Sequence, residues 1–143
     1  MKRIVIFFVM CLFFGSCALL QKTVPPVGVA RTGNFTVTVA QCTANAGTQE
    51  MTVVVMITNT GPNDQKWVGG SNDGTMAVDV RGNTLKPYTS AGWLHEFPTR
   101  VPVRVTIERF GPIVPGTAML RTLRVSIGSN SNIVEFRNVP VNW

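Results

Sequence analysis

Apolar residues recur at every second position in several short segments of this chain. Phe35, Val37 and Val39 alternate with threonines, and the same pattern returns in residues 101–107 and 123–127. A period of two places successive side chains on opposite faces of a strand, so that one face can pack against a core. Since no stretch repeats apolar residues at helical spacing, the sequence predicts an all-β protein.

Turn residues divide the chain into short predicted strands, because Gly, Pro, Asn and Asp gather between the apolar segments. Residues 52–58, TVVVMIT, are apolar on both faces and indicate a central strand. In residues 76–80, Met76, Val78 and Val80 are expected to face the core. An irregular, aromatic-rich loop is expected after residue 88. The predicted strands, in chain order, are 35–39, 52–58, 66–68, 76–80, 84–88, 101–108, 123–127 and 133–143.

Strands of this number and spacing in residues 33–143 predict an antiparallel β-sandwich of seven to eight strands, with a small barrel as the alternative. A chain of 143 residues is long enough for one ordinary domain and too short for two. The apolar content of 45% can supply a real core. The charged content of 14% is low, since about 25% is usual for globular proteins.

The N-terminus carries the pattern of a secretory signal peptide. Lys2 and Arg3 form a positive start, and residues 4–14, IVIFFVMCLFF, form an unbroken apolar run. This run is too short to span a bilayer as a helix, which takes about 20 residues. It fits the apolar region of a signal peptide, so we expect residues 1–16 to direct export and to be removed.

The residues that end this signal, Phe14-Gly15-Ser16-Cys17, resemble the lipobox of bacterial lipoproteins, although Phe14 stands where that family usually has leucine. The resemblance implies cleavage before Cys17 and a diacylglycerol on its sulfur. Because residue 18 is Ala rather than Asp, it also implies export to the outer membrane. The alternative is cleavage after Ala18 and plain secretion. If the chain is a lipoprotein, residues 17–32 are the lipid-anchor cysteine and its tether, which Pro25 and Pro26 keep extended.

Cysteine use agrees with a lipoprotein. Cys11 lies in the predicted leader and Cys17 at the predicted lipid, which leaves Cys42 as a lone cysteine. A lone cysteine in a strand behaves as a small buried apolar residue. A disulfide bond between Cys17 and Cys42 is possible only if the chain is secreted without a lipid and keeps Cys17.

Three segments resemble bacterial immunoglobulin-like domains of the telokin-like kind, which occur in envelope lipoproteins. They are Ile57–Gly61, ITNTG; Val101–Val105, VPVRV; and Val134–Pro140, VEFRNVP. The resemblance covers roughly residues 33–143. It implies an immunoglobulin-like β-sandwich, and it carries no shared catalytic residues.

The sequence gives little support for catalysis or for a cofactor. His95 is the single histidine, and no second histidine or cysteine pair stands at metal-ligand spacing. Asp64, Asp73 and Asp79 do not form the alternating acidic loop of a calcium site and are better explained as turn residues. We therefore expect a protein that is not an enzyme and holds no metal. A small hydrolase that uses His95 is the least favoured alternative.

The charge pattern argues against nucleic-acid binding. The formal net charge is +6, and Lys2 and Arg3 contribute to it from the predicted leader. The other lysines, Lys22, Lys66 and Lys86, lie far apart and are not interleaved with aromatic residues. A mild basic excess suits contact with anionic lipid or an acidic glycan, or it serves solubility alone.

Two groups of residues are candidate binding surfaces. The aromatic segment holds Tyr88, Trp93, His95 and Phe97, which would grip a sugar or a protein partner, unless Trp93 and Phe97 plug the end of the core. A second candidate follows if strand 101–109 pairs with 119–127, and that strand with 133–138. Arg104, Arg124 and Arg137 would then form a basic stripe on one face, unless Glu108 and Glu135 interleave with them.

These features together predict a lipid-anchored, non-enzymatic binding or assembly module of the bacterial cell envelope. Its expected contacts are the membrane, through the N-terminal lipid, and an envelope protein or an anionic glycan. A carbohydrate-binding or adhesion module that uses the aromatic segment is the alternative.

Overall fold

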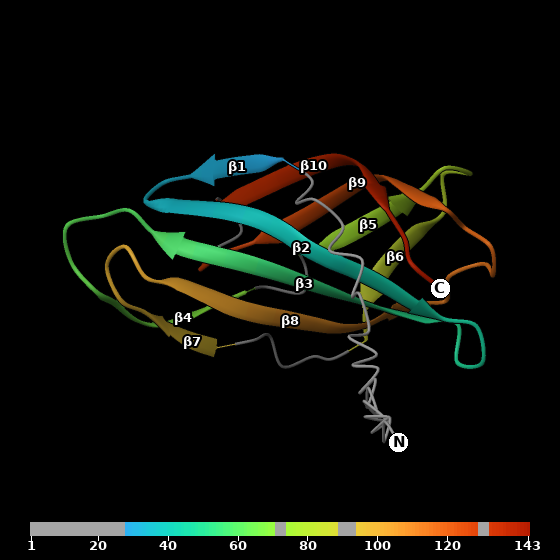
Figure 1. Cartoon of the computed structure of the whole chain (residues 1–143), viewed down its shortest axis with the longest axis horizontal. Coiled ribbons are helices and arrows are strands. Elements are labelled where there is room, and N and C mark those ends of the chain that lie inside the picture. Colours follow the sequence, from blue (N-terminus) through green and yellow to red (C-terminus); the bar gives the residue numbers. More distant parts are fainter. Residues whose placement is uncertain (1–27, 71–73, 89–93, 129–131) are drawn as a thin grey trace, which may run out of the picture.

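The computed structural model describes residues 28–70, 74–88, 94–128 and 132–143 (Figure 1). Within these ranges the chain forms strands and no helix, so the described residues include no helix that could cross a membrane. The prediction of an all-β protein is confirmed. The strands are β1 (Val29–Thr32), β2 (Phe35–Asn45), β3 (Glu50–Asn59), β4 (Gln65–Gly69), β5 (Met76–Asp79), β6 (Thr84–Pro87), β7 (Leu94–Phe97), β8 (Pro102–Gly111), β9 (Met119–Ser126) and β10 (Ile133–Pro140).

Eight of these strands form one antiparallel sheet in the order β1-β2-β3-β8-β6-β5-β9-β10. The sheet curls until its first strand, β1, lies beside its last, β10 (Figure 1). The result is a nearly closed barrel, which is the alternative architecture that the sequence allowed. β4 and β7 pair separately as a two-stranded sheet.

The segment after β10 closes the barrel next to the end of β2. The backbone N–H of Ala44 donates to the carbonyl of Asn142 at 2.7 Å, and the N–H of Asn142 donates to the carbonyl of Cys42 at 3.0 Å. These two bonds form a short parallel bridge between Thr43 and Asn142. The edge of β2 therefore has hydrogen-bond partners beyond Thr38, the last residue of β2 that pairs with β1.

The predicted strand 35–39 continues to residue 45 as β2, and a β-bulge explains why its alternation stops at Val39. Phe35, Val37 and Val39 face the core as expected, and then the register with β3 shifts between Val39 and Gln41. One extra residue in a strand reverses the parity of all that follow. Cys42 and Ala44 therefore face the core, and Thr43 and Asn45 face outward.

β3 is the central strand that residues 52–58 predicted. It pairs with β2 on one side and with β8 on the other. Its inward residues Met51, Val53, Val55 and Ile57 are fully buried. Val54, on the outer face, is buried as well, because side chains of both neighbouring strands flank it. Burial on both faces accounts for the continuous apolar run.

The prediction for residues 76–80 is wrong in its parity. Ala77 and Asp79 are buried, whereas Val80 is half exposed. The carboxylate of Asp79 decides this orientation. Its Oδ1 accepts the backbone N–H groups of Arg81 and Asn83, both at 2.8 Å, and its Oδ2 accepts the side-chain amide of Asn83 at 2.7 Å. A buried carboxylate with these partners can hold the turn after β5, so apolar alternation alone misplaced the strand.

The same hydrogen bonds set the acidity of Asp79. Burial favours the neutral acid and would raise the pKa, but the donors on Asn83 and Arg81 outweigh burial and lower the pKa below its ordinary value. A lowered folded-state pKa means that the ionised carboxylate stabilises the fold above the ordinary aspartate pKa. That stability is lost as the pH falls through the lowered value.

We expect Asp79→Asn to destabilise the protein by about 1–3 kcal/mol at neutral pH, because the new amide places a donor opposite the donor on Asn83. Denaturant unfolding measures this change. Asp64→Asn is the matched control and should cost less stability, since Asp64 is exposed and the oxygen of the new amide can still accept the N–H of Thr99. The wild type should also lose more stability than Asp79→Asn on acidification below the ordinary aspartate pKa. Equal stability of wild type and Asp79→Asn would contradict the assigned role.

Candidate functional site

The lipid-anchor candidate Cys17 and the aromatic candidate Trp93 lie outside the described residues. The remaining candidates can be placed. They do not form the two surfaces that the sequence predicted.

The aromatic candidates that the structure describes, Tyr88, His95 and Phe97, do not gather on one surface. Residues 94–97 form β7, and Phe97 is a core residue whose ring meets Phe35 edge to face, with ring centroids 5.6 Å apart. His95 is half buried against Phe97. Tyr88 is instead exposed and lines a depression that includes neither His95 nor Phe97. Phe97 therefore plugs the core, as the alternative held, and Tyr88 belongs to a different part of the surface.

The predicted basic stripe fails because one of its two strand pairings is wrong: 119–127 does pair with 133–138, but 101–109 does not pair with 119–127. β8 pairs with β3 and β6, and β9 pairs with β5 and β10, so two strands separate Arg104 from Arg124. Arg104 lies opposite Met56 on β3. Arg124 and Arg137 do lie close together, but Glu135 sits between them.

Glu135 neutralises part of the charge of that pair. Its Oε2 accepts Nε of Arg124 at 3.0 Å, and its Oε1 accepts Nε of Arg137 at 3.2 Å. These two hydrogen bonds lower the pKa of Glu135. The interleaved arrangement that the sequence left open is therefore present for Glu135, and all three side chains remain in contact with solvent.

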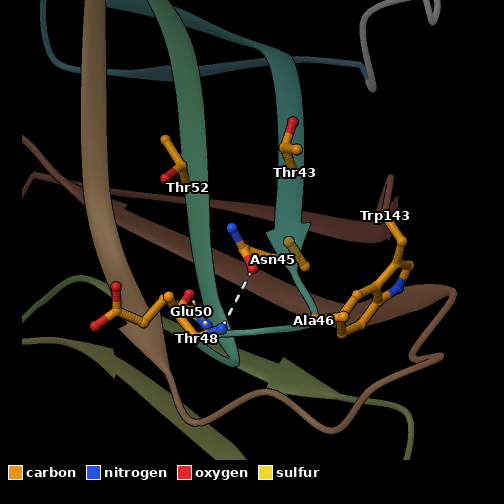
Figure 2. A pocket seen from close by; sticks show the side chains of 8 residues that line it. Thr43, Asn45, Ala46, Thr48, Glu50, Thr52 and Trp143 are labelled. Atoms are coloured by element: carbon orange, nitrogen blue, oxygen red, sulfur yellow. Dashed lines mark hydrogen bonds between the residues drawn. The ribbon is translucent and has the colours of Figure 1, made fainter.

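A depression lies at the β2–β3 hairpin, a place that the sequence did not single out. Figure 2 shows it from close by. Thr43 and Asn45 project outward from β2, Glu50 and Thr52 from β3, and the ring of Trp143 stands beside them. The depression holds about 620 Å³ and is lined by Thr43, Ala44, Asn45, Ala46, Thr48, Glu50, Thr52 and Trp143.

Local hydrogen bonds hold the hairpin turn in place. Asn45 Oδ1 accepts the N–H groups of Gly47 at 2.8 Å and Thr48 at 3.2 Å, and the Asn45 carbonyl accepts the N–H of Gln49 at 2.8 Å. Figure 2 draws the bond between Asn45 and Thr48. Gln49 adopts a positive φ of 55° where the turn reverses into β3. The turn, whose residues Asn45, Ala46 and Thr48 line the depression, is thus held by its own hydrogen bonds.

Trp143 is held in position although much of it is exposed. Its indole Nε1 donates to the carbonyl of Thr117 at 2.8 Å, and the preceding residue, Asn142, is paired with β2. The residue nevertheless exposes 44% of its surface. A half-exposed indole whose polar atom is already bonded offers an oriented apolar face to a ligand.

A second depression, of about 330 Å³, lies on the other side of Glu50. It is lined by Tyr88, Arg109 and Pro112 together with Thr48, Gln49 and Glu50, and so shares Thr48 and Glu50 with the first. Arg109 Nε donates to Glu50 Oε1 at 3.3 Å. Gly111 allows the Tyr88 ring to approach, since a Cβ there would lie 3.3 Å from that ring and 3.0 Å from the Gln49 carbonyl.

The sequence missed this site because its parts come from distant segments. Trp143 looked like the end of a final strand, and Thr43 lies beyond the bulge where period-two alternation stops being informative. The exposed aromatic residue that the sequence did identify, Tyr88, was assigned to the wrong neighbours. A usable signal was the run of Asn, Gly and Thr at 45–48, which marks a hairpin.

Within the described residues, no three His, Cys, Asp or Glu side chains lie close enough together to hold a metal ion. The one described cysteine, Cys42, is buried in the core with its Sγ 3.2 Å from Met51 Sδ. Burial in these apolar surroundings raises the pKa of the Cys42 thiol to about 12.

Comparison of the chain with known proteins finds no matching family model, no matching curated protein and no matching solved structure.

We expect the Cys42 thiol to resist alkylation by iodoacetamide at pH 8 in the folded protein, because only the thiolate reacts and burial keeps the thiol protonated. Full-chain protein with Cys11→Ala and Cys17→Ala leaves Cys42 as the only thiol, and mass spectrometry counts the adducts. The same protein in guanidinium chloride should react completely. Rapid reaction of the folded form would show that Cys42 is accessible.

Proposed function

We propose that this protein is an exported, lipid-anchored, non-catalytic binding module of the bacterial cell envelope. The observation that carries the binding role is the depression at the β2–β3 hairpin, where the fixed, half-exposed ring of Trp143 borders outward polar side chains. Exposed aromatic residues beside hydrogen-bonding groups are characteristic of binding sites on loops and strand ends.

The envelope location is supported by the N-terminal sequence. The basic pair at residues 2–3, the apolar run at 4–14 and Cys17 follow in the order of a lipoprotein signal. The segment from Cys17 to Gly28 spans at most about 40 Å when fully extended. A lipid on Cys17 would therefore keep the barrel close to a membrane surface, and Ala18 favours the outer membrane by resemblance to Gram-negative lipoproteins.

The proposal includes a place among immunoglobulin-like domains of the telokin-like kind. Two of the segments that carry this resemblance are neighbours in the sheet, because Ile57 lies opposite Val103 and Thr58 opposite Pro102. The third segment forms β10. Many such domains occur in envelope lipoproteins, so a protein or an anionic glycan of the envelope is the proposed partner.

Cys17→Ala should abolish metabolic labelling by palmitate in a bacterial host, whereas Cys42→Ala should leave labelling intact, since a buried core thiol is not a lipidation site. The intact mass of the mature wild type should correspond to a chain that begins at a diacylated Cys17. A mass that corresponds to unlipidated cleavage after Ala18 would overturn the anchored form of the proposal and indicate a secreted protein.

A further inference from the structure

We infer that the two depressions on either side of Glu50 form one binding track for a neutral oligosaccharide, in which Trp143 is the stacking platform. This inference rests on the proposed binding function and names the ligand class of the same surface. It shares Tyr88 with the aromatic segment that the sequence singled out, but its platform is Trp143, and its ligand is neutral rather than the anionic glycan that the sequence suggested as a partner.

Trp143 has the geometry that sugar binding requires. Its Nε1 bond to the Thr117 carbonyl and the pairing of Asn142 with β2 fix the ring before any ligand arrives. Preorganisation of this kind reduces the entropy lost on binding. The C–H groups on one face of a pyranose ring carry slight positive charge and pack against the negative face of an indole.

Polar groups stand beside this ring on the outer face of the hairpin. Thr43 and Thr52 are direct cross-strand partners, so their Cβ atoms lie roughly 4.5–5.5 Å apart. Asn45 follows on the same face, and Figure 2 shows all three with Trp143 around the depression. Threonine hydroxyls can donate and accept hydrogen bonds, and Asn45, whose Oδ1 already accepts two N–H groups of the turn, can donate through Nδ2. Such a set of groups matches the dual character of sugar hydroxyls.

The charges of the track favour a neutral ligand over an anionic one. The charged side chains that line the two depressions are Glu50 and Arg109, and these pair with each other at 3.3 Å. A phosphate or an acidic sugar would have to compete with Glu50 for Arg109, and the carboxylate of Glu50 would repel it. A neutral chain of sugars can instead cross this ion pair through hydrogen bonds.

The shared boundary extends the site beyond one sugar ring. Thr48 and Glu50 belong to both depressions, and Tyr88, which exposes 56% of its surface, borders the second. Trp143 and Tyr88 thus flank the hairpin with one aromatic residue in each depression. Both volumes lie in the range of about 300–1,000 Å³ that is usual for ligand sites.

Full-chain protein with Cys17→Ala is titrated by calorimetry with four neutral hexasaccharides, namely cellohexaose, maltohexaose, laminarihexaose and chitohexaose. We expect at least one to bind. Trp143→Ala should weaken that affinity about tenfold or more, and Tyr88→Ala should weaken it less. Trp143→Phe should retain most of the affinity, because it keeps an aromatic face.

Leu94→Ala is the matched control, since Leu94 is also a large exposed apolar residue but lies on β7, away from both depressions. It should leave affinity unchanged. Unfolding midpoints for all variants separate lost binding from lost folding. If none of the four sugars binds, or if Trp143→Ala binds as tightly as wild type, the inference is overturned.

The failure of this inference can be told from the failure of the proposed function. A photocrosslinker placed at Thr52 in cells reports what covers the track. Crosslinking to an envelope protein, with no sugar bound in calorimetry, overturns the glycan assignment and leaves a lipid-anchored binding module. Palmitate labelling of Cys17 is independent of both results.

Discussion

The candidate site depends on one extra residue in β2. Up to Val39 the odd-numbered side chains face the core, and after the bulge at Val39–Gln41 the even-numbered ones do. Without the bulge, Thr43 and Asn45 would point into the barrel, where their polar groups would lack partners. With it, Cys42 and Ala44 fill the core. The bulge therefore stabilises the end of the barrel and turns a polar row outward at the same point.

Closure of the barrel brings the aromatic platform to that row. The backbone bonds between Ala44, Asn142 and Cys42 fasten the segment after β10 to the edge of β2, so Trp143 comes to rest beside Thr43. These bonds join residues about a hundred positions apart in the sequence. The aromatic ring and the polar row become one surface only when the sheet curls completely, so the site is a product of the whole fold.

Most of the strands were predictable from the sequence, whereas their neighbours were not. Two strands were missed, because β1 lies in residues predicted to be a tether and β7 in residues predicted to be a loop. The alternation in 35–39 and the β-branched run in 52–58 report burial on one or both faces, which is a local property. Asp79 overrode alternation, because hydrogen bonds to Arg81 and Asn83 made a buried carboxylate acceptable. The pairing of β8 with β3 and β6 depends on long-range topology, so the assumption of successive hairpins misplaced Arg104. Trp143 carried no local signal of its role.

The curled sheet also determines how copies of this protein can behave when they are crowded. A flat sheet presents two rows of unpaired backbone groups, and these invite neighbouring chains to add strands. Here the two outer strands of the large sheet, β1 and β10, lie beside each other, and Asn142 occupies the far edge of β2. The large sheet therefore offers neighbouring copies of the protein fewer open strand edges than a flat sheet of the same eight strands would.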